Sequence, residues 1–370
     1  MKRSFVLALA FVVAATQMAG PAWGASPTSN PRPPRKSATR PRMPAYDPTE
    51  GDNVDGDDLT VRRAAVQALG NRNGSVVVVD PASGRVLTIV NQKLALKSGF
   101  IPCSTIKLVT ALAALSEHLV ERDTVVHVTR RLSINLTNAL AMSNNEYFAL
   151  LGRRLGYDRV AHYAQMLGLG EKAGLDIEGE QPGEIASEAP REGGVGLMTA
   201  FGTGFLVTPL ELAALLTAIA NGGTFYYLQY PRTQADSEAF QPRIKRPLEL
   251  APASIEDLKA GMRGAVDFGT ARRAAFDPNE PLFGKTGTCA DFRDGATFLG
   301  WFGAFNTAGP HQLVVVVMLT SPMHNVSGGL ASAVGGALYK DLAAQQYFAS
   351  SGPGRDGLPE ILVTKACCSR

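Results

Sequence analysis

Residues 100–115 read FIPCSTIKLVTALAAL, and the organisation of the remaining chain follows from this stretch. From Ser104 onward the apolar residues recur as on a helix that is buried nearly all round, so Ser104 is expected at the helix N-terminus. Lys107 then lies one turn further along, on the same face. Backbone N–H groups at a helix start stabilise negative charge, and an amine beside a serine can activate it as a nucleophile. Taken alone, S-x-x-K is most often a helix cap followed by a solvated lysine.

Two further short motifs follow in order along the chain. Ser143-Asn144-Asn145 lies in AMSNNEYFALLGRRLG, and Lys285-Thr286-Gly287-Thr288 lies in LFGKTGTCADF. The ordered set S-x-x-K, S-x-N and K-T-G is typical of penicillin-binding proteins and serine β-lactamases. In these motifs the chain resembles the transpeptidase domain of penicillin-binding proteins. The resemblance extends to the segments VVVVDPASGRVLTIV, GTGFLVTPLELAALLTAIANGG, GTARRA and FLGWFGAF, and so reaches most of residues 75–348.

The resemblance implies a role for each residue in acyl transfer. Ser104 would be the nucleophile and Lys107 the base that accepts its proton. The amine must then be neutral part of the time, and burial beside a second lysine, Lys285, would lower its pKa in that direction. Ser143 would relay the proton to the leaving nitrogen, and Asn145 would hold the substrate amide.

The K-T-G-T segment is implied to bind the substrate. Lys285, Thr286 and Thr288 would bind the substrate's terminal carboxylate, while Gly287 lets the backbone approach closely. The backbone N–H groups of Ser104 and Thr288 would form the oxyanion hole. By itself K-T-G-T is more typical of a surface turn, and only the other motifs favour a site.

Cysteines flank two of the motifs. Cys103 directly precedes the expected nucleophile and Cys289 directly follows K-T-G-T. Thiols on elements that must face each other should be oxidised in an exported protein, so we expect a Cys103–Cys289 disulfide. Many penicillin-binding proteins have glycine at the first position, and the pair is similar to the bridge of class A carbapenemases. The alternative is two unpaired buried thiols. Cys367 and Cys368 are adjacent and poorly placed to pair with each other, so they are expected to be free or to link chains.

The ends of the chain differ in composition from its middle. Residues 1–24 are typical of a secretory signal peptide, with an apolar run shorter than the ~20 residues that span a bilayer. An uncleaved anchor is the alternative to removal, and after cleavage no integral membrane segment is expected. Residues 25–58 are expected to form a disordered linker, Pro/Arg-rich and then acidic. A catalytic domain over residues 59–350 and a tail over 351–370 complete the chain, which is expected to be exported to the bacterial periplasm or cell envelope.

Strand patterns at both ends of the catalytic domain enclose a mainly helical segment. An α+β fold is therefore expected, with one antiparallel sheet flanked by N- and C-terminal helices and an inserted all-helical subdomain at about residues 108–222. The active site would lie where the sheet meets this subdomain. Strands are expected at residues 75–80, 85–90, 282–289, 297–305 and 312–319, and helices at 59–70, 209–220, 254–266 and 330–348. Residues 224–250 are expected to be loop with a strand or two.

Composition and motif searches exclude several other functions. A formal net charge of +3 gives no indication of nucleic-acid binding. The five histidines show no metal-ligand spacing, and neither a metal nor a cofactor is expected. Residues 283–286 look like the end of a phosphate-binding loop, but that motif needs a glycine where Asn279 stands.

The function expected first is a D-alanyl-D-alanine transpeptidase or carboxypeptidase that acts on peptidoglycan stem peptides and is inhibited by β-lactam antibiotics. The first alternative is a serine β-lactamase, which must activate water on the acyl-enzyme. Class A β-lactamases activate this water with a glutamate after the second motif, and Glu184, Glu188 and Glu192 lie in that region but not in the expected E-x-x-x-N pattern. Class D enzymes use a carbamylated lysine in an apolar pocket, and Asn145 would make that pocket too polar. The cysteine pair favours the lactamase slightly. A penicillin-binding sensor or scaffold without turnover is a second alternative, against which the complete motif set argues.

Overall fold

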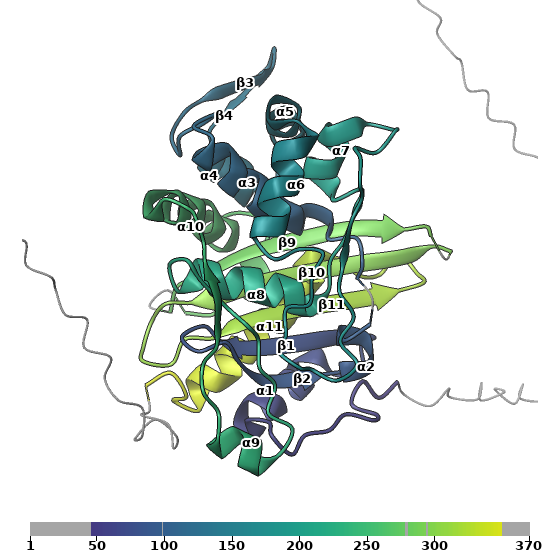
Figure 1. The fold of residues 1–370 in the computed structure, drawn as a ribbon, viewed down its shortest axis with the longest axis vertical. Coiled ribbons are helices and arrows are strands. Elements are labelled where there is room, and N and C mark those ends of the chain that lie inside the picture. Colours follow the sequence, from purple (N-terminus) through teal and green to yellow (C-terminus); the bar gives the residue numbers. More distant parts are fainter. Residues whose placement is uncertain (1–45, 98, 278–279, 294, 350–370) are drawn as a thin grey trace, which may run out of the picture. The chain divides into compact units, whose positions relative to one another are not determined.

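A five-stranded antiparallel sheet forms the centre of the fold, with strand order β2-β1-β11-β10-β9 (Figure 1). The computed structural model describes residues 46–97, 99–277, 280–293 and 295–349. The expected signal peptide, the linker up to residue 45, the tail, Cys367 and Cys368 lie outside the described residues. The strands of the sheet are β1 (Gly74–Asp80), β2 (Arg85–Val90), β9 (Leu282–Asp291), β10 (Thr297–Asn306) and β11 (Val314–Ser321). The antiparallel sheet expected from both ends of the sequence is confirmed.

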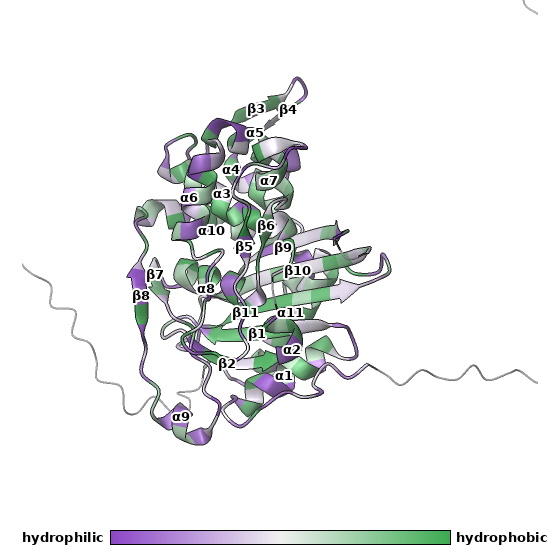
Figure 2. Cartoon of the chain, turned by 45° about the vertical axis from the view of Figure 1, so that its right-hand side comes forward, coloured by the Kyte–Doolittle hydropathy of each residue, from purple (hydrophilic) through white to green (hydrophobic). Residues whose placement is uncertain are grey.

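Helices cover both faces of the sheet. α1 (Leu59–Leu69) and α11 (Gly328–Ala344) pack on one face, and α8 (Pro209–Ala220) packs on the other. Successive side chains of a strand point to opposite faces, so Val76 and Val78 join the core of the first layer while Val77 joins that of the second. Because both faces are buried, the inner strands of the sheet are rich in apolar residues, as their green colour in Figure 2 shows.

The inserted subdomain is smaller than expected and is not all helical. The helical lobe consists of α4 (Leu136–Ala141), α5 (Asn145–Leu155), α6 (Tyr157–Met166) and α7 (Gly194–Phe201). It also contains a hairpin of β3 (Val126–Thr129) and β4 (Leu132–Ile134), and the short pair β5 (Glu184–Ile185) and β6 (Phe205–Leu206) lies beyond it. α8, which we expected inside the subdomain, packs on the sheet, because all of its residues are buried and it has no polar face.

Smaller elements complete the described part of the chain. Residues 224–250, expected to be loop with a strand or two, contain the pair β7 (Thr224–Tyr226) and β8 (Ile244–Pro247) with α9 (Gln234–Glu238) between them. The others are α2 (Gln92–Ala95), η1 (Cys103–Ile106), α3 (Lys107–Ser116), α10 (Pro252–Asp267) and η2 (Arg272–Ala274). Among the described residues, no helix has the length and apolar character needed to cross a membrane.

The expected linker over residues 25–58 ends earlier than its composition suggested, because residues 46–58 pack on the domain. Asp52 and Asp57 pair with Arg62 of α1 at 2.8 and 3.1 Å, and their side chains are only 2 % and 0 % exposed. Asp52 also accepts hydrogen bonds from the backbone N–H groups of Asn91 and Gln92. These carboxylates are therefore partners of a buried arginine and of backbone donors, and the acidic run is not a solvated tether.

Candidate active site

The S-x-x-K motif lies at the junction of η1 and α3. Ser104 is the second residue of the 3₁₀ turn, and α3 begins at Lys107. The helical segment expected to begin at Ser104 thus starts with one tighter turn, which is common at helix N-termini. Cys103 has a φ of 53°, in the left-handed region that glycine favours, and so sets the direction in which the chain enters the turn. Nine residues of α3, Lys107–Leu115, are buried, which confirms a helix enclosed by the core.

Lys107 is the centre of the hydrogen-bond network. Its Nζ atom lies 2.9 Å from Ser104 Oγ, 3.1 Å from Ser143 Oγ and 2.9 Å from the Ser143 carbonyl oxygen. Asn145 Oδ1 lies 2.5 Å from the same nitrogen, so four oxygens surround an amine that can donate to at most three of them at once. The structure therefore brings together four of the residues singled out in the sequence, although 36 residues separate Lys107 from Ser143.

The S-x-N motif occupies a tight turn between two helices. α4 ends at Ala141, and Ser143 has a φ of 54°, which reverses the chain direction. The Asn144 side chain caps α5 by accepting the N–H of Tyr147 at 2.8 Å. The hydroxyl of Ser143 and the amide of Asn145 consequently face the same amine.

The third motif brings a second lysine to the same hydroxyl. Lys285 of β9 donates from Nζ to Ser143 Oγ at 2.9 Å and to the Thr286 carbonyl at 2.8 Å. A hydroxyl accepts two hydrogen bonds and donates one. With both amines donating to it, the hydroxyl proton of Ser143 is left for a ligand.

Burial lowers the pKa of both lysines. Lys107 and Lys285 are fully buried, and burial lowers the pKa of Lys107 to about 7. The pKa of Lys285 is lowered well below its usual value, first by burial and then by the charge of Lys107. We expected burial beside the charge of Lys285 to lower the pKa of Lys107, and burial is the cause in the structure. Neutral Lys107 amine is therefore present near pH 7.

The rest of K-T-G-T lies close to η1, the turn that carries Ser104. β9 is an edge strand and runs beside the helical lobe (Figure 1). A Cβ atom on Gly287 would lie 2.9 Å from the Pro102 carbonyl oxygen, so only glycine allows this approach. Thr288 Oγ1 accepts the N–H of Gly328 at 2.8 Å. Thr286 Oγ1 lies 2.6 Å from Thr270 Oγ1.

Thr270 belongs to the GTARRA run, to which the sequence had assigned no role. Its backbone N–H donates to the Ala141 carbonyl at 3.1 Å, two residues before Ser143. The available signal was the position of the run, which precedes K-T-G-T in the order that the resemblance implies.

The two cysteines flanking the motifs are joined in the structure. The sulfur atoms of Cys103 and Cys289 are 2.02 Å apart, and the Cα atoms are 5.5 Å apart. The bond links η1 to β9, the two elements that carry Ser104 and Thr288. Trp301 of β10 adds a second link, because its indole N–H donates to the Ile101 carbonyl at 3.0 Å.

The three glutamates considered as deacylating bases are all exposed: Glu184, Glu188 and Glu192. The partners of Lys107 in the described part of the chain are hydroxyl, carbonyl and amide oxygens, with no carboxylate among them. No group of three or more His, Cys, Asp or Glu residues suited to a metal ion occurs among the described residues.

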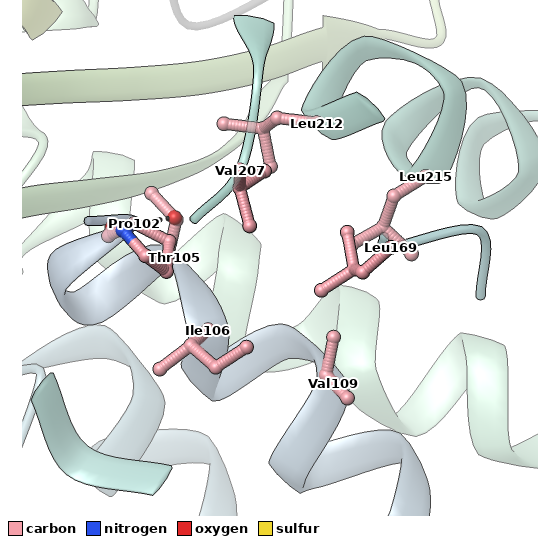
Figure 3. A pocket seen from close by; sticks show the side chains of 8 residues that line it. All are labelled: Pro102, Thr105, Ile106, Val109, Leu169, Val207, Leu212 and Leu215. Atoms are coloured by element: carbon pink, nitrogen blue, oxygen red, sulfur yellow. Dashed lines mark hydrogen bonds between the residues drawn. The ribbon is translucent and has the colours of Figure 1, made fainter. Parts of the chain in front are cut away.

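A small apolar pocket lies beside η1 (Figure 3). Pro102, Ile106 and Val109 line it from the segment of η1 and α3, and Leu212 and Leu215 line it from α8. Its walls are almost entirely aliphatic, and Ser104 and Lys107 are not among its lining residues. It therefore belongs to the packing of η1 and α3 against α8 and not to the reactive centre.

Comparison with known proteins agrees with this geometry. The family model for the penicillin binding protein transpeptidase domain matches residues 74–342. The chain belongs to this family. Among curated relatives, stage V sporulation protein D of Bacillus subtilis (strain 168) is 29 % identical over 316 residues, which cover 74 % of this chain and 48 % of the relative. The peptidoglycan D,D-transpeptidase MrdA of Haemophilus influenzae is 24 % identical over 351 residues, which cover 75 % of this chain and 53 % of the relative. The chain thus spans about half the length of these relatives.

Solved structures of similar proteins show the same fold. Penicillin-binding protein 2 of Pseudomonas aeruginosa in complex with WCK 5153 aligns with a TM-score of 0.67 and 24 % identity, covering 80 % of this chain and 76 % of that one. The transpeptidase domain of penicillin-binding protein 3 from Burkholderia pseudomallei gives a TM-score of 0.67 at 20 % identity, covering 80 % of this chain and 98 % of that domain. The sheet and lobe of this chain therefore have the fold of penicillin-binding protein transpeptidase domains.

Proposed function

We propose that the chain is a serine acyltransferase of the bacterial cell envelope, a D-alanyl-D-alanine transpeptidase or carboxypeptidase that acts on peptidoglycan stem peptides. One observation carries the proposal: the Lys107 amine lies 2.9 Å from Ser104 Oγ and 3.1 Å from Ser143 Oγ, buried and with a pKa lowered to about 7. Neutral Lys107 can accept the serine proton, which is what a serine nucleophile needs.

In the acylation step, Ser104 Oγ attacks the carbonyl carbon of the penultimate D-alanine while its proton passes to Lys107 Nζ. The oxyanion that forms is stabilised by the backbone N–H groups of Ser104 and Thr288. When the C–N bond breaks, the leaving nitrogen takes a proton from Ser143, which Lys107 replaces. The product is an acyl-enzyme ester on Ser104 and free D-alanine.

The acyl-enzyme is then attacked by a second nucleophile. An amine of another stem peptide gives a cross-link, whereas water gives a trimmed peptide. The substrate's terminal carboxylate is held by Lys285, Thr286 and Thr288, and Asn145 binds the substrate amide. A β-lactam acylates Ser104 by the same attack but leaves an ester that reacts slowly, so it acts as an inhibitor.

The exposed positions of Glu184, Glu188 and Glu192 argue against a β-lactamase with a class A base. The polar contact between Asn145 Oδ1 and Lys107 argues against a carbamylated lysine, which needs an apolar pocket. The complete network from Ser104 to Lys285 argues against a scaffold without turnover.

The Cys103–Cys289 contact supports work in an oxidising compartment outside the cytoplasm. We therefore place the protein in the periplasm or cell envelope, exported by a signal peptide. This location also suits a substrate that is part of the cell wall.

Intact-protein mass spectrometry with benzylpenicillin and a carbapenem, without reductant, tests the proposal. A penicilloyl adduct that lasts many minutes and is absent from Ser104→Ala is expected. Rapid adduct loss with consumption of the drug would make the protein a β-lactamase, and adduct formation on Ser104→Ala would refute the assignment altogether. Incubation with a D-Ala-D-Ala peptide, with and without an amine acceptor, then separates cross-linking from trimming.

A further inference from the structure

Both threonine hydroxyls of K-T-G-T are contacted from the side by groups outside the three motifs. The N–H of Gly328, the first residue of α11, lies 2.8 Å from Thr288 Oγ1. Thr270 Oγ1 lies 2.6 Å from Thr286 Oγ1. The two contacts come from different elements, but they act on residues two apart on the same strand, whose side chains point to the same face.

The direction of the first hydrogen bond is fixed by chemistry. A backbone N–H can only donate, so Thr288 Oγ1 must accept from Gly328. One lone pair of the Thr288 hydroxyl is thereby occupied. Its own proton remains free to donate to a ligand.

The second contact joins two hydroxyls, either of which can donate. A bound carboxylate resolves the choice, because donation from Thr286 to an anion gives a charge-assisted bond, stronger than a bond between neutral hydroxyls. Thr286 Oγ1 then accepts a hydrogen bond from the Thr270 hydroxyl, so that Thr270 donates to Thr286 and Thr286 donates to the carboxylate. Consecutive hydrogen bonds in one direction polarise and strengthen one another.

The backbone holds Thr270 in place independently of its hydroxyl. Its N–H bonds the Ala141 carbonyl at 3.1 Å. The preceding residue, Gly269, is packed so tightly that a Cβ atom there would overlap the Ala141 carbonyl oxygen. The hydroxyl of Thr270 is therefore presented to Thr286 by the turn between α10 and η2, which the end of α4 holds in place.

We propose that Thr270 is a positioning residue that donates its hydroxyl proton to Thr286 and thereby directs the Thr286 proton at the terminal carboxylate of the substrate or of a β-lactam. The inference rests on the proposed function, since it assumes that the carboxylate binds at Thr286. Thr270 touches neither the substrate nor the reacting atoms. Its effect should appear in binding of the carboxylate and not in the chemistry at Ser104.

The test compares Thr270→Val, which keeps the shape and removes the hydroxyl, with Thr270→Ser, which keeps the hydroxyl. The readouts are the dissociation constant before acylation and the limiting acylation rate, for benzylpenicillin and for its methyl ester. Thr270→Val should weaken benzylpenicillin binding about tenfold, as expected for a lost hydrogen bond that serves a charged group. The limiting acylation rate and the dissociation constant of the methyl ester should change less than about twofold in Thr270→Val. Thr270→Ser should match wild type in all of these quantities.

A second measurement tests whether Thr270 acts through Thr286. On a Thr286→Val background, adding Thr270→Val should weaken benzylpenicillin binding no further, whereas independent sites would give additive losses. Three results would each overturn the inference. They are an equal loss of affinity for benzylpenicillin and its methyl ester in Thr270→Val, weakened benzylpenicillin binding by Thr270→Ser, and unchanged benzylpenicillin binding by Thr270→Val. If Thr270→Val does not fold, Thr270→Ala is compared with Thr270→Ser in the same way. Failure of wild type to form any adduct at Ser104 refutes the proposed function instead.

Discussion

The titration of Lys107 should control the rate at which a β-lactam acylates Ser104. Only the neutral amine can accept the serine proton, and burial lowers the pKa of this lysine to about 7. The rate of acylation should therefore rise with pH up to about 7 and become constant above about 8. Protonation at lower pH removes the base without removing the nucleophile.

The size of the effect follows from the position of this pKa. At pH 6 roughly one tenth of Lys107 is neutral, and at pH 5 about one hundredth, so each pH unit costs about tenfold in rate. A lysine with the ordinary pKa of 10.5 would be neutral in about one molecule in 3,000 at pH 7, and its rate would still be rising at pH 10. Between pH 8 and pH 10 the acylation rate should be constant if the pKa of Lys107 is about 7, but should still rise if the pKa is 10.5.

The assay is rapid-mixing labelling with a fluorescent penicillin from pH 5 to pH 10, quenched and measured on gels. Thermal unfolding at each pH controls for loss of the fold, and correction for drug hydrolysis controls for loss of the reagent. A rate independent of pH, or one that rises to pH 10 without levelling, would show that Lys107 is not a base with a lowered pKa.

Three further outcomes are expected. Burial lowers the pKa of Lys107 in the folded protein but not in the unfolded chain, so the free energy of unfolding should rise with pH. Measured by urea unfolding, the wild type should gain about 2 kcal/mol relative to Lys107→Met between pH 7.5 and 9. A difference between the two proteins that does not change with pH would contradict the burial argument. In denaturant without reductant, Cys103 and Cys289 should not be alkylated, because their sulfur atoms are bonded to each other. Reduction of this disulfide should lower the free energy of unfolding by about 2–4 kcal/mol. Alkylation of both residues in the unreduced protein would rule the disulfide out. Gly300→Ala would place a Cβ atom 2.5 Å from the Ser327 carbonyl oxygen and should destabilise the fold by about 1–3 kcal/mol. Gly329→Ala is the control, because its Cβ atom would make only ordinary contacts of 3.8 and 3.9 Å and should not destabilise. Equal unfolding midpoints for the two variants would show that the Gly300 contact relaxes freely.

The local part of the site could be predicted from the sequence. The spacing of Ser104 and Lys107 places them on one helix face whatever the rest of the fold does, and their bond length of 2.9 Å agrees. The strand over residues 282–289 was also predicted from the pattern of the longer segment, although K-T-G-T alone is more typical of a turn, and β9 covers it. The approach of Ser143 to Lys107 is different, because no local rule brings together residues 36 positions apart. Only the resemblance to a known family linked the motifs.

The partners of buried polar groups could not be predicted. A run of acidic residues is usually solvated, and nothing local marks Asp52 and Asp57 as partners of the buried Arg62. Thr270 is a similar case, since a threonine beside a glycine is a common turn element, and its role depends on a strand that begins 12 residues later. Patterns of polarity predict exposure, whereas pairing over long distances depends on the tertiary fold.

The site departs from local preferences at the positions where chemistry is proposed. Cys103 and Ser143 adopt a left-handed conformation that costs about 1 kcal/mol or more for a residue with a side chain. Lys107 and Lys285 are buried although lysine is rarely buried, and a cation of the same sign raises that cost further. None of these features stabilises the fold, so the apolar surroundings of α3 and the contacts between η1 and β9 must maintain them. The same features supply what acyl transfer requires, namely a neutral amine next to a serine and a second hydroxyl with a free proton. The disagreement between local preference and structure is therefore itself an argument that residues 103–107, 143–145 and 285–288 form the functional site.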